Sequence, residues 1–234
     1  MKKLKPYKIT KNAILYRVKT AAGVDRRAFA AAEWPADKPL LCFSFKSFKL
    51  NPAKPPRFAV SGKYSQRIAC YSPGRGIKNP GRPCHAVGIS ARAPKSLAEL
   101  RRISRKHFFA YVRRFGNRLG AELGKDYPEY DRIYLPKVKA LVLEKNGKDV
   151  GLYTHASLTG VAGKRLDSMF WHCLVPGLSK AERASAHYQA ALWLKKTTKL
   201  QVGVAFDLVD KESYEFFSGL GFATCRATFQ RRRK

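Results

Sequence analysis

The spacing of apolar residues changes along the chain, and each change marks a new element. In residues 1–95, short apolar runs alternate with polar residues, as in Leu40–Leu50, and this period of two is typical of strands. From Ser96 to Leu123 the apolar residues recur at helical spacing, and Ser96 with Glu99 matches a capping box at the start. The pattern therefore predicts a β-rich region followed by a long helix.

The second half of the chain alternates apolar runs with capped helical stretches. The predicted elements are a hairpin over Val138–Ala156, a strand over Ser168–Val175, a helix over Ser179–Lys196, a strand over Val202–Phe206 and a short helix begun by Asp210. Strand, helix and strand in this order form a crossover unit. Such units are almost always right-handed, with parallel strands in one sheet.

A segment rich in glycine, proline and arginine separates the two halves. Its composition, from Ser72 to Ala93, predicts a loop or flexible arm. We therefore expect two parts, a basic β-rich region over residues 1–95 and an α/β domain over residues 96–234.

The net charge of the chain gives the strongest indication of its binding partner. The chain has 47 Lys and Arg against 16 Asp and Glu, a net charge of +31, and Lys38 to Ala98 contains no acidic residue. Self-repulsion at this charge lowers stability, and a polyanion offsets it through neutralisation and counterion release. We expect nucleic acid, double-stranded DNA in the first place, as the partner; an anionic membrane surface or merely solubilising charge are the alternatives. The residues expected to contact it are Arg75, Lys78, Arg82, Arg101, Arg102, Arg105, Lys106, Arg113, Arg114, Arg231, Arg232 and Arg233.

Several classes of protein are disfavoured by composition. No apolar run approaches the roughly 20 residues of a membrane span. The basic start lacks the apolar core of a signal peptide. Five scattered cysteines without a CxxC pair indicate neither a disulfide framework nor a zinc finger, so a cytoplasmic location is expected.

The end of the last predicted helix carries a more specific pattern. Phe216-Phe217 followed by Leu220-Gly221-Phe222 resembles the last strand–helix unit of the GNAT acyltransferase superfamily, and the upstream elements follow the order of that family. The resemblance implies a GNAT-like mixed sheet with flanking helices over residues 96–234. It also implies that the two parallel strands splay apart at their carboxyl ends and admit an acyl thioester.

Two departures from the family bear on the acyl donor. The segment from Gly177 to Ser185 lacks the Arg/Gln-x-x-Gly-x-Gly/Ala loop whose backbone binds the CoA pyrophosphate. The donor is therefore open, acetyl-CoA or another acyl carrier. Phe217 stands where many family members have the tyrosine that protonates the leaving thiolate, and Tyr214 is the candidate replacement. The residues that the resemblance places beside the donor are Leu174, Val175, Gly177 and Lys180.

The high charge and the missing loop together resemble the Mom-type phage proteins, which modify adenine in DNA. That resemblance implies an adenine amine as acceptor, and iron with His155, His172 and Asp167 as candidate ligands. From the residues alone, Asp207, His172 and Asp167 are the groups able to take the proton of an attacking amine, and Ser185 could orient it. Asp207 is favoured because ligands bind at the carboxyl ends of strands in α/β sheets.

Three functions stay open at this point. The chain could be an acyltransferase-type enzyme that modifies DNA bases, an acetyltransferase that acts on protein or tRNA, or a non-catalytic nucleic-acid-binding protein on the same fold.

Overall fold

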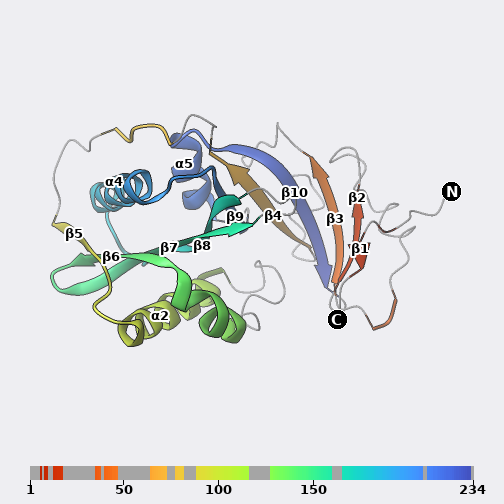
Figure 1. Ribbon diagram of the computed structural model, residues 1–234, viewed down its shortest axis with the longest axis horizontal. Coiled ribbons are helices and arrows are strands. Elements are labelled where there is room, and N and C mark those ends of the chain that lie inside the picture. The colour runs from red at the N-terminus through yellow and green to blue at the C-terminus, as the bar shows by residue number, and fades with distance from the viewer. Residues whose placement is uncertain are drawn as a thin grey trace.

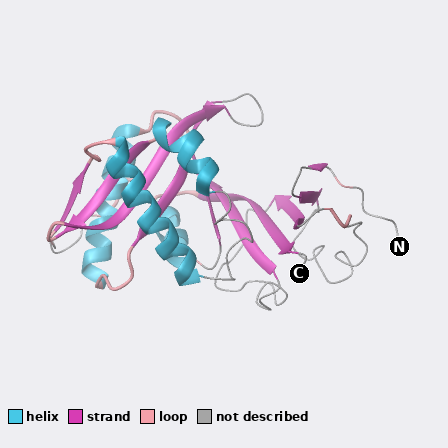
Figure 2. Cartoon of the chain, turned by 90° about the horizontal axis from the view of Figure 1, so that it is seen from below, coloured by secondary structure: helices cyan, strands magenta, loops and turns pink. Residues whose placement is uncertain are grey.

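The computed structural model describes residues 6, 8–9, 13–17, 35–37, 40–46, 64–72, 77–81, 88–115, 127–159, 165–207 and 210–232. Within these residues the chain forms a mixed sheet with helices on both faces, as the sequence predicts (Figures 1 and 2), and ten strands belong to it. The strands are β1 (Lys8–Ile9), β2 (Ala13–Arg17), β3 (Leu40–Lys46), β4 (Tyr64–Tyr71), β5 (Ile89–Arg92), β6 (Lys139–Lys145), β7 (Lys148–Thr159), β8 (Arg165–Leu174), β9 (Val202–Asp207) and β10 (Ala223–Arg232). The helices are α2 (Leu97–Phe115), α4 (Lys180–Thr197) and α5 (Lys211–Gly219), with a π-helical turn at Tyr130–Tyr134 and a 3-10 turn at Leu135–Lys137.

Strands β5 to β8 lie side by side at one end of the sheet, each antiparallel to the next. The predicted hairpin is confirmed: Asn146 and Gly147, with φ of 51° and 72°, make the tight turn between β6 and β7. Along β6, Val142 packs under α2 whereas Leu141 and Leu143 pack on the opposite face. Because both faces are covered, the middle of the strand has to be apolar, and residues 140–143 are apolar without a break.

The central feature is the separation of β8 from β9. The two strands are parallel and adjacent, as predicted, but they pair only at Asp167–Val202 and Ser168–Gly203. Directly after this point β8 carries a bulge against β7, because Thr154 and His155 face Trp171 and Met169 and leave one extra residue in β8. A bulge bends its strand. Strand β8 therefore turns away from β9 toward its carboxyl end.

Helices α4 and α5 cover the face of the sheet opposite to α2 (Figure 1). Helix α4 connects β8 to β9 and begins with the predicted capping box between Ser179 and Glu182. Asp210 caps α5 by accepting a hydrogen bond from the Ser213 backbone N–H, at 3.1 Å. Among the described helices, none is both long and apolar enough to span a membrane.

Helix α2 begins close to where the sequence predicts. The Ser96 hydroxyl accepts a hydrogen bond from the Glu99 N–H at 3.1 Å, but the Glu99 carboxylate bonds the N–H of Lys95, at 2.5 Å. The carboxylate is drawn outward because it also binds Arg92 of β5. Residues 116–123 of the predicted helix lie outside the described residues.

The prediction of a loop or arm over residues 72–93 is wrong at its end. Residues 89–92 form β5, the edge strand next to β6, and Ile89 is buried there. Four residues in a Gly/Pro-rich neighbourhood give too short a pattern to be recognised as a strand. Arg75 and Arg82 lie outside the described residues.

Strands of residues 1–95 and of residues 96–234 belong to the same sheet. Strand β4 lies antiparallel between β9 and β10, and β3 pairs with the other edge of β10. Figure 1 shows β4 beside β10, the last strand of the chain. The sheet therefore crosses the boundary that composition places near residue 95.

Candidate active site

A pocket lies where β8 leaves β9, between the end of α2 on one face of the sheet and helices α4 and α5 on the other. Residues of β7, β8 and all three helices line it: Tyr111, Arg114, Tyr153, His172, Cys173, Leu174, His187, Asp210, Glu212, Ser213 and Phe216. The separated strands allow side chains from both faces of the sheet to meet in one place.

A hydrogen bond joins the two faces across this gap. The Tyr111 hydroxyl of α2 donates to Asp210 Oδ2 at 3.0 Å, and the Ser213 hydroxyl donates to the same oxygen at 2.6 Å. Burial and the nearby charges of Asp210 and Asp207 raise the pKa of Tyr111 well above its ordinary value. Tyr111 is therefore protonated at neutral pH and acts as a donor.

A second polar group surrounds Glu212 at the start of α5. Arg183 of α4 donates from Nη1 to both carboxylate oxygens, at 2.6 and 2.7 Å, and Arg114 of α2 lies 3.7 Å from Oε2. His187 Nε2 lies 3.6 Å from Oε1. One carboxylate thus links α2 and α4 to α5.

His187 is the titratable side chain of the pocket best suited to accept a proton. Its ring stacks on Phe216 with a centroid distance of 4.6 Å and an interplanar angle of 29°. Burial lowers the pKa of His187 below its ordinary value, although the charge of Glu212 opposes the shift. The imidazole is therefore neutral at pH 7, which is the form that accepts a proton.

Aromatic rings fill the space on the α5 side of the divergent strands. His172 of β8 meets Phe217 and Phe206 edge to face, with centroids 4.9 and 6.0 Å away. Phe206 and Phe217 stack at 5.8 Å. These contacts fix the angle between β8, β9 and α5, so the pair Phe216-Phe217 shapes the pocket from the helix side.

No family model and no curated protein matches the chain. Among solved structures, a functionally unknown conserved protein from Staphylococcus epidermidis is similar over 99% of this chain and 95% of its own, with 10% identity and a TM-score of 0.55. A GCN5-related N-acetyltransferase from Kribbella flavida is similar at 13% identity, over 89% and 72% of the two chains, with a TM-score of 0.46. A GCN5-related N-acetyltransferase from Sphaerobacter thermophilus is similar at 14% identity, over 88% of this chain and 63% of its own, with a TM-score of 0.44. The likeness to the Staphylococcus epidermidis protein, which spans nearly the whole of both chains, shows a shared fold.

In this fold the residues predicted from the sequence fall into two groups. His172 and Leu174 line the pocket. Asp207 ends β9 with 4% of its surface exposed, near enough to Tyr111 to influence its pKa, but it is not among the lining residues. Ser185 is buried within α4, and Tyr214 packs half-buried against the core.

Asp167 lies at the opposite end of β8 from the pocket. Its carboxylate accepts hydrogen bonds from the Ser157 hydroxyl at 2.5 Å and from the N–H groups of Lys199 and Leu200 at 2.9 and 3.0 Å. These bonds lower the pKa of Asp167 and fasten the start of β9 to β8. Asp167 therefore stabilises the sheet in this structure and does not line the pocket.

The residues named as iron ligands are not brought together. His155 bonds the Thr197 hydroxyl at 2.8 Å at the carboxyl end of α4, whereas His172 is at the pocket. Within the described part of the chain, no three His, Cys, Asp or Glu side chains are grouped as a metal site requires.

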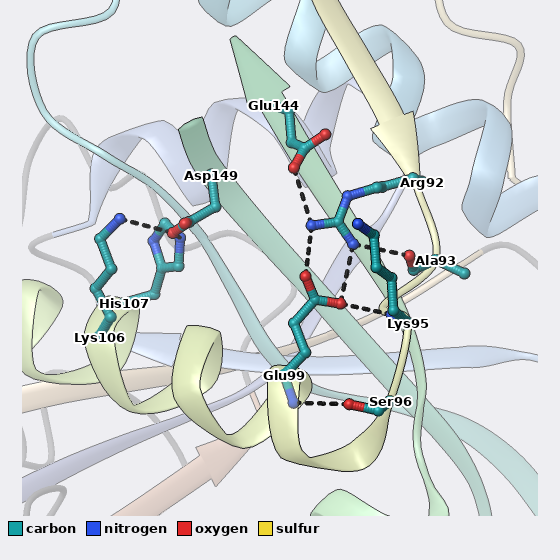
Figure 3. Close-up of polar contacts among 9 residues, drawn as sticks. All are labelled: Arg92, Ala93, Lys95, Ser96, Glu99, Lys106, His107, Glu144 and Asp149. Carbon is teal, nitrogen blue, oxygen red and sulfur yellow. Dashed lines mark hydrogen bonds and ion pairs between the residues drawn. The ribbon is translucent and has the colours of Figure 1, made fainter. Parts of the chain in front are cut away.

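The basic face of α2 is a second candidate surface, beside the pocket. A groove is lined by Arg101, Arg102, Arg105, Lys106, Tyr127 and Asp131. Figure 3 shows that some α2 side chains are held by the sheet: Lys106 and His107 point to Asp149 of β7, and Glu99 points to Arg92. Arg102 and Arg105, in contrast, form no ion pair with any carboxylate of the described residues.

The other predicted cations lie in different surroundings. Arg113 is exposed, but Arg114 belongs to the pocket and its carboxylate network. Lys78 is exposed and its side chain lies against Gly221 after α5. Arg231 and Arg232 end β10, and Arg233 lies outside the described residues.

Among the site residues that were not predicted from the sequence as functional are Tyr111, Glu212, His187 and Arg183. Tyr111 and Glu212 carry no motif and meet only because α2 and α5 approach the same gap. His187 and Arg183 lie in the first half of the crossover helix, two positions to either side of Ser185. The polar residues in the first half of α4, the helix that follows the diverging strand β8, were the only signal in the sequence that could have indicated these two positions.

Proposed function

We propose that the chain is an acyltransferase that acts on an amine of a nucleic acid, with an adenine amine in DNA as the first acceptor. The observation that supports this most directly is the pocket at the carboxyl end of β8, where a neutral histidine, a protonated tyrosine and the carboxylates of Asp210 and Glu212 meet. Such groups handle protons without themselves forming a covalent bond to the substrate.

The proposed chemistry requires one proton acceptor. The amine nitrogen attacks the carbonyl carbon of the activated acyl group, the new C–N bond forms and the bond from that carbon to its leaving heteroatom breaks. His187 takes the proton that the nitrogen loses, and the carboxylate of Glu212, 3.6 Å away, stabilises the imidazolium. The imidazolium then returns the proton to the leaving atom, so the protein ends as it began.

The nucleic acid is assigned to the groove on α2. Arg105 and Tyr111 lie on the same helix six residues apart, a rise of about 9 Å. A duplex whose phosphates contact Arg102 and Arg105 would therefore hold a neighbouring nucleotide close to the pocket. A base in a duplex has to leave the stack to reach such a site.

Nucleoside mass analysis of cells that express the chain tests the proposal. We expect an acylated deoxyadenosine in DNA with the wild-type chain and its loss with His187→Gln, which keeps the size of the side chain but accepts protons far less readily. A modified nucleoside in tRNA alone would move the acceptor from DNA to RNA. Unmodified DNA and RNA together with acetylated cellular protein would contradict a nucleic acid acceptor.

A further inference from the structure

Helix α2 exposes one large aromatic side chain that packing does not explain. The Phe109 ring is 40% exposed and belongs to neither of the buried clusters that join the sheet to its helices. A single exposed apolar residue is ordinary on a protein surface. The neighbours of Phe109 therefore decide whether the ring has a function.

Cations lie on both sides of this ring. Arg105 precedes Phe109 by four residues and Arg113 follows it by four, so the three side chains form one row along α2 with a rise of about 6 Å from each to the next. Both arginines are exposed, and neither forms an ion pair with any carboxylate that the structure describes. The Arg105 guanidinium carbon lies 6.0 Å from the centre of the Phe109 ring, near the outer limit of a cation–π contact. The row thus offers a flat apolar face between two positive charges.

Two buried aromatic residues fix the orientation of the exposed ring. Phe108 meets Phe109 edge to face with the ring centroids 5.4 Å apart, and Tyr127 packs against it with the centroids 5.7 Å apart. Tyr127 also lines the basic groove together with Arg105, so the ring and the groove adjoin. A ring that is held in place before binding loses little conformational freedom when a ligand stacks on it.

An unpaired base fits this surface better than a duplex or a bilayer does. Aromatic side chains among basic ones bind single strands, because every base has a flat face that stacks and every phosphate a charge that pairs with arginine. In a duplex the neighbouring base pairs cover those faces and leave only the base edges accessible. A bilayer surface requires a broad apolar face. Among the described residues 101–114, Phe109 is the one large apolar side chain that is exposed.

We propose that α2 binds an unpaired nucleotide by stacking its base on Phe109, with Arg105 and Arg113 on phosphates to either side. This inference rests on the nucleic acid partner of the proposed function and specifies the form of that partner: the strand is unpaired where it crosses α2. Phe109 does not line the pocket, whereas Tyr111, two residues further along, does. The stacked nucleotide is therefore a neighbour of the acceptor, and Phe109 is a binding residue and not a catalytic one.

Fluorescence anisotropy with three labelled DNA probes tests the inference on the full chain. The probes are an oligothymidylate of about 12 residues, which suits the usual site size for single strands, an abasic strand with the same number of phosphates, and a blunt duplex. Salt at about 0.15 M limits long-range attraction to the basic chain. We expect the wild-type chain to bind the oligothymidylate about tenfold more tightly than the abasic strand, because only the former has bases to stack.

Variants of Phe109 separate stacking from charge. Phe109→Leu keeps an apolar side chain and a good helix former but removes the flat face. It should bind the oligothymidylate about tenfold more weakly, at the level of the abasic strand. Its slope of log affinity against log salt should not change, since stacking releases no counterions. Unchanged binding of the duplex would show that the variant is folded.

Two further variants complete the comparison. Phe109→Tyr keeps an aromatic face and should bind the oligothymidylate as the wild type does. Leu192→Ala is the matched control, because Leu192 is an equally exposed apolar residue on α4, across the sheet from α2. It should leave the binding of all three probes unchanged.

The outcomes separate this inference from the proposed function. Equal wild-type binding of the oligothymidylate and the abasic strand, or an unchanged oligothymidylate affinity in Phe109→Leu, would overturn the inference and leave a nucleic acid acceptor standing. A Phe109→Leu variant that loses binding to phosphatidylglycerol vesicles but not to DNA would also overturn it and assign the ring to a membrane surface. Stacking that depends on Phe109 in a chain that modifies no nucleoside would uphold the inference and contradict the proposed function.

Discussion

At the scale of single residues, two side chains compete for the same chemical role. His187 lines the pocket, whereas Asp207 lies buried at the end of β9 behind Tyr111. We predict that His187→Gln lowers the rate of acyl transfer by a factor of about 10² or more with DNA binding unchanged. Asp207→Asn, which also preserves shape, should reduce the rate less. Single-turnover rates measured on both variants decide between them, and the reverse order would assign the proton acceptor to Asp207, as the sequence predicts.

The pH dependence of the rate offers an independent measurement on His187. The imidazole has to be neutral to accept a proton, and burial lowers its pKa from the ordinary 6.5. We therefore expect kcat/KM to be level around pH 7 and to fall only as the pH drops below 6.5 toward the lowered pKa. His187→Gln should lose this acidic limb. A rate that already falls between pH 8 and pH 7 would contradict a neutral, buried histidine.

His172 and Asp207 could be predicted as candidates because each belongs to an apolar strand whose carboxyl end is recognisable; His172 lines the pocket, and Asp207 lies outside its lining. The sequence could not identify His187, since a histidine on a helix gives no sign of the carboxylate it will meet. Asp167 shows a different difficulty. A buried aspartate on a strand suits chemistry and structure equally, and only its three hydrogen bonds at the far end of β8 decide for structure.

At the scale of elements, α2 carries both the basic groove and one wall of the pocket. Replacing Arg102 and Arg105 together by alanine should weaken DNA binding without sequence preference. The slope of log affinity against log salt should fall by about two, one for each lost phosphate contact. Fluorescence anisotropy over a salt series measures this. Arg165→Ala, an exposed arginine at the start of β8, is the control and should leave the slope nearly unchanged.

The contact between β7 and β8 depends on a missing side chain. A Cβ at Gly151 would lie 2.6 Å from Leu174 Cδ2 and 3.2 Å from the Cys173 carbonyl oxygen. We predict that Gly151→Ala lowers the free energy of unfolding by about 1–3 kcal/mol, because Leu174 has to move in a packed strand. Urea denaturation measures this loss. Equal stability would mean that Leu174 can rotate aside without cost.

Element by element, the sequence predicts well what is local. The hairpin, the capped helices and the crossover follow from spacing and capping residues within short windows. Strand β5 is too short for such a window. The place of β4 between β9 and β10 depends on pairing between distant parts of the chain, which no local pattern encodes.

At the scale of the whole molecule, buried histidines couple stability to pH. Burial lowers the pKa of His107, His155 and His187 below the ordinary 6.5 of the unfolded chain. Below pH 6.5 the unfolded chain therefore takes up protons that the folded chain does not, and the fold loses stability as the pH falls. We expect a lower free energy of unfolding at pH 5.5 than at pH 7.5, from urea denaturation with equal slopes. No difference would show that these histidines protonate freely in the fold.

The position of β4 has a consequence for how the protein is made. Strands β3 and β4 leave the ribosome early, but the strand that lies between them in the sheet, β10, is the last to emerge. Until β10 emerges, β3 and β4 lack the strand that pairs with them in the native sheet. Exposed strand edges of this kind promote aggregation. Closing the sheet also requires contacts between the two ends of the chain, which form slowly. Electrostatic repulsion between chains of such strong positive charge keeps nascent chains apart during this interval. The charge therefore favours correct assembly of the sheet, in addition to any role in binding a partner.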